Sequence, residues 1–244
     1  ASAASLKRSI LVTAVMRICF SSSMRLTRAR TVPSVTPSCS AISRLLTRAS
    51  RVLEARGEHR LAAACAEQLA WILRDRGQSE HALSAFERAG ALAAHSREAT
   101  GDEGAHGVAA AVGIGVVWTD QERFREAEAS LRGARAAADV VRDSGLSDRA
   151  ALALARCLYW QSRYDEAAVE AAALVASPRD GDIAVEAWAL LARARAAQGD
   201  IRAALTAAGE ATNRADGGLA RIAATACRSM AVVQRLVGDE EQVR

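Results

Sequence analysis

Four histidines and five cysteines are the side chains of this 244-residue chain best suited to bind metals or act as bases and nucleophiles. They are His59, His81, His95 and His106, and Cys19, Cys39, Cys65, Cys157 and Cys227. His81 and His95 lie fourteen residues apart on one predicted helix, about 21 Å of helical rise, so they cannot bind one metal ion. No cysteine pair has metal or redox spacing. Cys65, Cys157 and Cys227 fall in apolar helical patterns and are predicted to be small buried side chains in a reducing compartment.

One short segment, GDEGAH at residues 101–106, gathers groups that could do chemistry. Asp102 and Glu103 lie close to His106 in a predicted loop, and a metal or general-base site could form there with a group from elsewhere. A polar loop between helices is the simpler interpretation, because a single carboxylate–histidine cluster is a weak signal. The sequence has no glycine-rich phosphate loop, HExxH motif or GxSxG motif, and no cofactor is expected.

From about residue 41 onward, apolar residues recur at three- and four-residue spacing, which is typical of amphipathic helices. Breaks are predicted at residues 57, 77, 120–123, 144–145, 162, 177–181, 199–200, 216–218 and 238. The chain is 50% hydrophobic, mostly alanine, and only 4% aromatic, which favours closely packed helices. These features predict an all-α fold of about ten helices.

Repeating columns of residues appear when the chain is aligned on the predicted turns at Gly77, Glu122, Ser162, Gly199 and Gly238. Seven residues before each turn is a small residue: Ala70, Gly115, Ala155, Ala192 and Ala231. Eight before is a large apolar one: Leu69, Ile114, Leu154, Leu191 and Met230. Five after is Ala82, Ala127, Ala167 or Ala204, with Val243 in the last copy. Antiparallel helices need small side chains where their axes approach, and each pair leaves an apolar face that the next pair must cover, so the pairs are expected to stack.

These columns resemble the tetratricopeptide repeat over about residues 60–244, most clearly in LAWILRDRGQSEHALSAFERA and LARCLYWQSRYDEAAVEAAAL. The turns are 45, 40, 37 and 39 residues apart, longer than the family's usual repeat of about 34, as in the longer repeats of bacterial signalling and transcription regulators. The resemblance implies a right-handed superhelical solenoid of antiparallel helix pairs over residues 41–244. Residues 41–56 would form a capping helix, and the last repeat would be truncated.

The resemblance also implies protein binding in a concave groove lined by the first helix of each pair. Transferred to this chain, the groove positions are Glu67, Trp71, Arg74, Asp75, Val112, Val116, Asp120, Arg149, Arg156, Tyr159, Trp160, Glu186, Arg193, Arg228 and Arg235. Arginine binds carboxylates bidentately and stacks on aromatic rings, so a protein or acidic peptide is the expected ligand. The aromatic residues could instead fill the core, and the arginines could be solvated. None of these positions is asparagine, so the family's carboxylate clamp for chaperone tails is not supported.

Two functions therefore remain open. The leading hypothesis is a protein-interaction scaffold within a larger bacterial regulator. The alternative is a hydrolase of esters or phosphoesters, metal-assisted or not, with its site in the groove or the 101–106 loop. An unfinished last repeat would also leave an apolar end that favours self-association or a continuing chain.

Residues 1–40 differ from the rest. The first 53 residues hold nine basic and no acidic side chains, whereas the remainder holds 23 basic and 28 acidic. A nucleic-acid arm, a targeting peptide and a weakly ordered or non-native leader are all consistent with this composition. The leader is favoured and nucleic acid is not expected as a partner, because no interleaved aromatic residues or recognition helix accompany the charges. The apolar run at 10–16 is far below the ~20 residues that span a bilayer, so a cytoplasmic protein without a membrane span is predicted.

Overall fold

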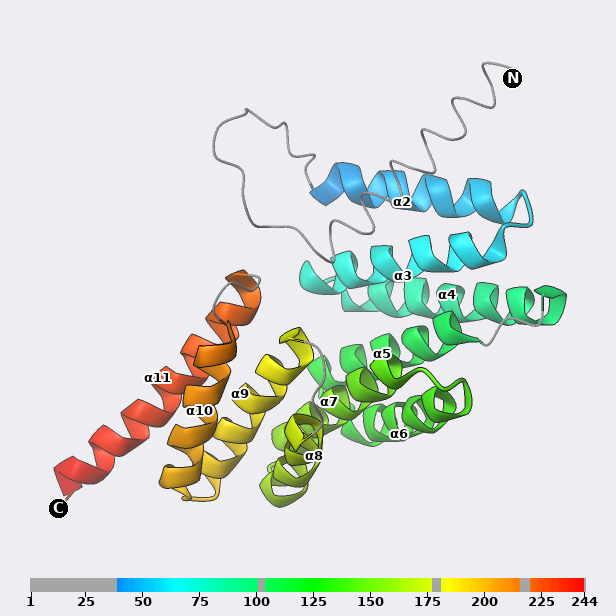
Figure 1. Ribbon diagram of the computed structural model, residues 1–244. Coiled ribbons are helices and arrows are strands. Elements are labelled where there is room, and N and C mark those ends of the chain that lie inside the picture. The colour runs from blue at the N-terminus through cyan, green and yellow to red at the C-terminus, as the bar shows by residue number, and fades with distance from the viewer. Residues whose placement is uncertain (1–38, 101–103, 177–180, 216–219, 244) are drawn as a thin grey trace. The chain divides into compact units, whose positions relative to one another are not determined.

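The computed structural model describes residues 39–100, 104–176, 181–215 and 220–243, which form ten helices and no strand (Figure 1). The helices are α2 (Cys39–Glu54), α3 (His59–Asp75), α4 (Ser79–Thr100), α5 (Ala105–Asp120), α6 (Phe124–Val140), α7 (Ser144–Trp160), α8 (Tyr164–Ala176), α9 (Gly181–Ala197), α10 (Ile201–Ala215) and α11 (Ala220–Val243). The predicted all-α class with about ten helices is confirmed. Nearly all of the predicted leader lies outside the described residues.

Helix contacts divide the chain into two compact units, Ala1–Gly113 and Ile114–Arg244. In the first unit, α3 packs against both α2 and α4. In the second, each helix from α6 to α10 packs against the next one along the chain, and α9 also contacts α7 and α11. Consecutive packing of this kind is the arrangement of a helical-repeat solenoid, in which each pair covers the apolar face of its neighbour.

The turns that end the first helix of each pair share one backbone conformation. Gly77, Glu122, Ser162 and Gly199 all have a left-handed φ, of 72°, 61°, 60° and 81°. The amide of the following residue donates to a carbonyl five residues earlier, at 2.9 Å for Arg123 to Trp118 and 3.0 Å for Arg163 to Leu158. These are the bonds of a Schellman motif, which satisfies the last carbonyls of a helix. Four of the five turns chosen for the sequence alignment are therefore structurally equivalent.

Two of the predicted breaks are wrong. The turn after α6 has its left-handed residue at Arg142, before residues 144–145, because the Asp143 carboxylate accepts a hydrogen bond from the Leu146 amide at 3.0 Å and caps α7. Helix α11 runs through Gly238 without a break. A single interior glycine costs only about 0.5–1 kcal/mol relative to alanine, which is too little to end a helix.

The small-residue columns lie where paired helices approach most closely. Ala70, Ala155 and Ala192 are fully buried seven residues before their turns, and so are Ala82, Ala127, Ala167 and Ala204 five residues after. At Gly115 an added Cβ would lie 2.6 Å from Cγ of the buried Leu131, so the position admits glycine alone without rearrangement. Ala231 of the fifth copy is exposed, so the column holds in four copies.

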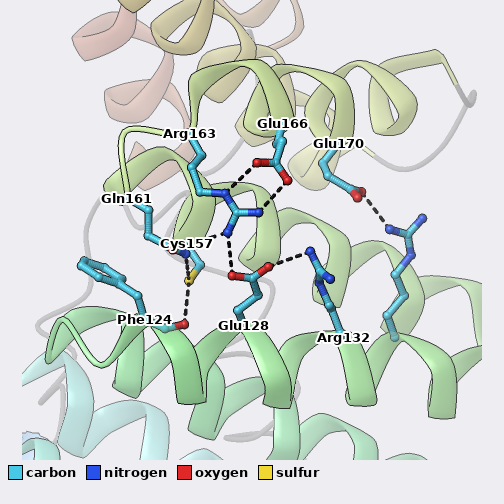
Figure 2. Close-up of polar contacts among 9 residues, drawn as sticks. Phe124, Glu128, Arg132, Cys157, Gln161, Arg163, Glu166 and Glu170 are labelled. Atoms are coloured by element: carbon cyan, nitrogen blue, oxygen red, sulfur yellow. Dashed lines mark hydrogen bonds and ion pairs between the residues drawn. The ribbon is translucent and has the colours of Figure 1, made fainter.

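Polar contacts join successive pairs in the second unit (Figure 2). Arg163, in the turn before α8, donates to Glu166 at 2.6 Å and reaches back to Glu128 of α6 at 2.7 Å. Arg135 of α6 donates to Glu170 of α8 at 2.8 Å. In the same region the Cys157 thiol lies 3.9 Å from the Phe124 carbonyl and accepts from Gln161 at 3.4 Å. Because Arg163, Arg135 and Cys157 contact residues 33 to 35 positions away, they hold one pair against the next.

We expect Arg163→Gln to lower the thermal unfolding midpoint at pH 7 more than Arg132→Gln, because the ion pair of Arg132 is with Glu128 of its own helix and its effect on Glu166 is weaker than that of Arg163. The Arg163 hydrogen bond lowers the pKa of Glu166 below its usual value. A lowered folded-state pKa adds stability above about pH 4.3 that is lost as the pH falls through the folded pKa. The difference between Arg163→Gln and the wild type should therefore shrink between pH 7 and pH 3. Equal losses in the two variants at pH 7 would contradict the bridging role.

We also expect Gly113→Ala to destabilise the fold by about 1–3 kcal/mol, because the new Cβ would lie 2.2 Å from the ring of the fully buried Phe86. Gly133→Ala is the matched control. Gly133 also lies inside a helix, and no atom lies within 4 Å of the Cβ that alanine would add. This variant should therefore be more stable than wild type by about 0.5–1 kcal/mol. Urea unfolding of both variants measures the difference, and a Gly113→Ala variant as stable as wild type would refute the close approach.

Candidate functional site

Eight of the predicted groove residues lie on three first helices of the second unit, which we call the α7–α9–α11 face. They are Arg149, Arg156, Tyr159 and Trp160 on α7, Glu186 and Arg193 on α9, and Arg228 and Arg235 on α11. Each helix carries two charged positions seven residues apart, which places them on one side of the helix two turns apart. Since α9 packs against both α7 and α11, the three stripes are neighbours.

Arg156 and Glu186 form the first contact across this face. The Arg156 guanidinium donates to the Glu186 carboxylate at 3.0 Å, thirty residues away. Glu186 is largely buried, with 13% of its side chain exposed. A carboxylate this buried needs a counter-charge, so Arg156 is in part occupied by the protein itself.

Arg193 differs from Arg156, because its guanidinium is largely withdrawn from solvent and forms no ion pair with a carboxylate among the described residues. Its guanidinium carbon lies 5.2 Å from the centre of the Tyr159 ring, in cation–π geometry. Its Nε is buried and has no hydrogen-bond partner among the described residues. Burial lowers the pKa of Arg193 below its usual value. The Arg156 and Arg228 charges also lower this pKa, whereas Tyr159 and the Glu186 carboxylate raise it.

An arginine stays charged in proteins, so Arg193 is a largely desolvated cation near two other cations and near one carboxylate, Glu186, which is already paired with Arg156. Taking a charge out of water costs several kcal/mol unless a counter-charge offsets it. The Tyr159 ring gives back only about 0.5–2 kcal/mol. The arrangement is therefore suited to an incoming anion, whose carboxylate or phosphate oxygens would satisfy the guanidinium.

Tyr159 is the centre of an aromatic group beside this cation. Its ring meets Trp160 edge-on at 5.7 Å and tilts against Tyr164 at 5.4 Å, while Arg193 covers its face. Trp160 is 59% exposed, so a large apolar surface is open beside the arginines. Exposed aromatic rings of this kind commonly anchor partners at protein interfaces.

The predicted groove residues of the first unit have other roles. Trp71 packs edge-on against the buried Phe86 at 5.0 Å, and Arg74 covers its ring at 5.8 Å. Arg74 also lies 3.6 Å from the exposed Asp75 carboxylate. Trp71 is therefore part of the packing between α3 and α4, as the core interpretation of this residue expects.

The second copy contradicts the transferred positions. Val112 and Val116 of α5 are buried and cannot present their side chains to a ligand, whereas Asp120 at the end of α5 is exposed. Helix α5 is apolar on all sides. The positions transferred from the family therefore do not identify a solvent-exposed face on this helix.

The structure also differs from the prediction at the 101–106 cluster. Asp102 and Glu103 lie outside the described residues, and His106 belongs to α5, not to a loop. Its Nδ1 lies 3.5 Å from the Glu67 carboxylate of α3, a pairing of two predicted residues that spacing did not reveal. The described part of the chain holds no group of three or more histidine, cysteine, aspartate or glutamate side chains that could bind a metal.

Cys65 and Cys157 are buried as predicted, but Cys227 is exposed.

Arginine–tryptophan stacking is a recurring feature that sequence reasoning missed. Arg123 lies over Trp118 at 5.1 Å, and Arg214 lies over Trp188 at 5.9 Å. The residues of the first pair are five positions apart across a turn, and those of the second pair are 26 positions apart. No common sequence spacing therefore predicts these contacts.

No family model matches the chain, and no curated protein matches it. Among the described helices, none combines the length and the hydropathy needed to cross a membrane.

We expect Arg193→Met to raise the free energy of unfolding by about 1 kcal/mol, because it removes a desolvated cation and keeps a long apolar side chain over Tyr159. Arg156→Met should instead lower it by about 1 kcal/mol, since Glu186 loses its counter-charge in a half-exposed pair. Chemical denaturation of the two variants in parallel measures both effects. If Arg193→Met is the more destabilised variant, the guanidinium contributes to the fold and is not held for a ligand.

Proposed function

We propose that this chain is a protein-interaction scaffold whose α7–α9–α11 face binds an acidic segment of a partner protein. The single observation that carries the proposal is the Arg193 guanidinium, which is largely withdrawn from solvent and whose Nε has no hydrogen-bond partner among the described residues. The charges that act on it are those of Arg156, Arg228 and Glu186, and Glu186 is already paired with Arg156. A glutamate or aspartate of the partner would supply the missing acceptor.

The surroundings of Arg193 favour an acidic ligand over a neutral one. Five of the eight residues that define the face are arginines, and Glu186, the single acid among them, is already paired with Arg156. Such a surface raises the association rate of acidic partners and disfavours basic ones. Trp160 adds an exposed ring on which an apolar or aromatic side chain of the same partner can pack.

The setting of the interaction is a further part of the proposal. The repeat columns resemble those of bacterial signalling and transcription regulators, so the face would recruit a partner within such a regulator. Cys65 and Cys157 are buried in the helical core and form no disulfide with the described residues, which supports a reducing, cytoplasmic location.

The hydrolase hypothesis gains no specific support from the described contacts. Two residues of its loop site, Asp102 and Glu103, lie outside the described residues, and His106 is placed beside Glu67. It stays a prediction, as does self-association through the C-terminal repeat.

Selection of a displayed random peptide library on the whole chain tests the proposal. We expect enrichment of peptides that combine aspartate or glutamate with an aromatic residue. Binding of the selected peptides should weaken roughly 10–100-fold in Arg193→Met, the usual effect of losing a hydrogen bond to a charged group. Arg202→Met is the control, because Arg202 is an exposed arginine of α10 outside the face.

Two results would refute the acidic-segment proposal. One is a selected population without excess acidic residues. The other is a set of peptides whose affinity falls equally in Arg193→Met and Arg202→Met. Because Arg193→Met is expected to be at least as stable as wild type, loss of binding in this variant cannot be attributed to unfolding.

A further inference from the structure

A cavity of about 720 Å³ lies in the first unit, between α2 and α4 and over α3. It belongs to a different unit from the α7–α9–α11 face and does not depend on the function proposed for that face. Its volume is within the range of about 300–1,000 Å³ that is typical of small-molecule sites.

The floor and the walls of this cavity differ in chemistry. Ala66, Leu69 and Leu73 of α3, spaced by three and four residues, form an apolar floor, and both leucines are only half-buried. The wall from α2 carries Arg44, Arg48 and Arg51 at helical spacing, together with hydroxyl side chains. The wall from α4 carries His81, Ser84 and Arg88, also at helical spacing.

These polar walls explain why the cavity stays open. Two helices that flank a third normally close over it with apolar side chains, but closing α2 onto α4 would bury several guanidinium groups without counter-charges. Ser50 is the exception on the α2 wall, since it is buried and donates to the Ala62 carbonyl at 3.1 Å.

The charge in the cavity is unbalanced. Four arginines line it and no aspartate or glutamate does. Arg88 pairs with Glu54 of α2, but no carboxylate of the described residues pairs with Arg44, Arg48 or Arg51. The equivalent space between α6 and α8 is bridged by matched pairs, among them Arg135 with Glu170. The α2–α4 gap thus has one such bridge, Arg88 with Glu54, and three further arginines that no carboxylate of the described residues pairs with.

We propose that this cavity binds a small amphiphilic anion, with a carboxylate or phosphate head group on the arginines of α2 and an apolar body on the α3 floor. Arginine recognises both head groups through paired hydrogen bonds. The half-buried leucines of the floor would gain burial from the apolar body, which inorganic anions cannot provide.

Calorimetric titration of the whole chain tests the site with four probes: decanoate, decyl phosphate, decanol and inorganic phosphate. We expect at least one of the two amphiphilic anions to bind at one site per chain. Its affinity should exceed those of decanol and inorganic phosphate by roughly tenfold or more, since each of these probes lacks one half of the interaction.

Three variants locate the binding. Arg44→Gln combined with Arg48→Gln should weaken it by roughly tenfold or more, since two charge-assisted contacts are removed. Ser84→Trp, at an exposed wall position, should abolish it by filling the space. Arg56→Gln, an exposed arginine of the α2–α3 turn that does not line the cavity, should leave the affinity unchanged.

The proposal is overturned if neither amphiphile binds, or if inorganic phosphate or decanol binds as tightly as both. It is also overturned if Ser84→Trp and the double arginine variant, shown to be folded by circular dichroism, bind like wild type. Hexaglutamate serves as a last probe, and a peptide that binds as tightly as the amphiphiles would assign the site to a protein partner.

Discussion

The close approach of the two helices in each pair is the constraint on which the rest of this structure depends. Fully buried alanines such as Ala155 and Ala167 let the axes come together, and at Gly115 even a methyl group would collide with Leu131. A left-handed residue then turns the chain with its carbonyls satisfied. In the second unit the first helices α7, α9 and α11 lie side by side, because α9 packs against both of the others, and the three helices can share one face.

Arginine is used in two contrasting ways on this scaffold. Arg163 is satisfied by two carboxylates, Glu128 and Glu166, and it holds one pair against the next. Arg193 is more withdrawn from solvent, yet its guanidinium lies over the Tyr159 ring and forms no ion pair among the described residues. The same chain therefore has the means to pair its cations and leaves particular ones unpaired. A position that costs stability without a structural return is where function is to be sought.

The local parts of this fold could be predicted from the sequence, and the distant contacts could not. The turns at Gly77 and Gly199 can be predicted from the residue type, because glycine favours a left-handed φ. The turns at Glu122 and Ser162 can be predicted only from the aligned columns. The Asp143 cap and the unbroken helix at Gly238 each depend on a free-energy difference of about 1 kcal/mol. The spacing of residues in the sequence does not predict differences of this size. The candidate site shows the same division. The stripes of α7, α9 and α11 are predicted from the resemblance to the repeat family, but burial decides that Val112 is core and Arg193 is a desolvated cation.

The basic N-terminal region acquires a different meaning once α2 is placed. The predicted leader ends at residue 40, and three of the nine basic residues that precede Glu54, namely Arg44, Arg48 and Arg51, lie beyond it on helix α2 and line a cavity. A solvated leader would bind any polyanion through charge alone. Three guanidinium groups fixed at helical spacing above an apolar floor select a ligand by its shape as well as by its negative charge. The ligand must present its anionic group and its apolar part to opposite sides of one cavity. This geometry selects for an amphiphile and against a uniformly charged chain, even though the net charge of the region is the same in both cases.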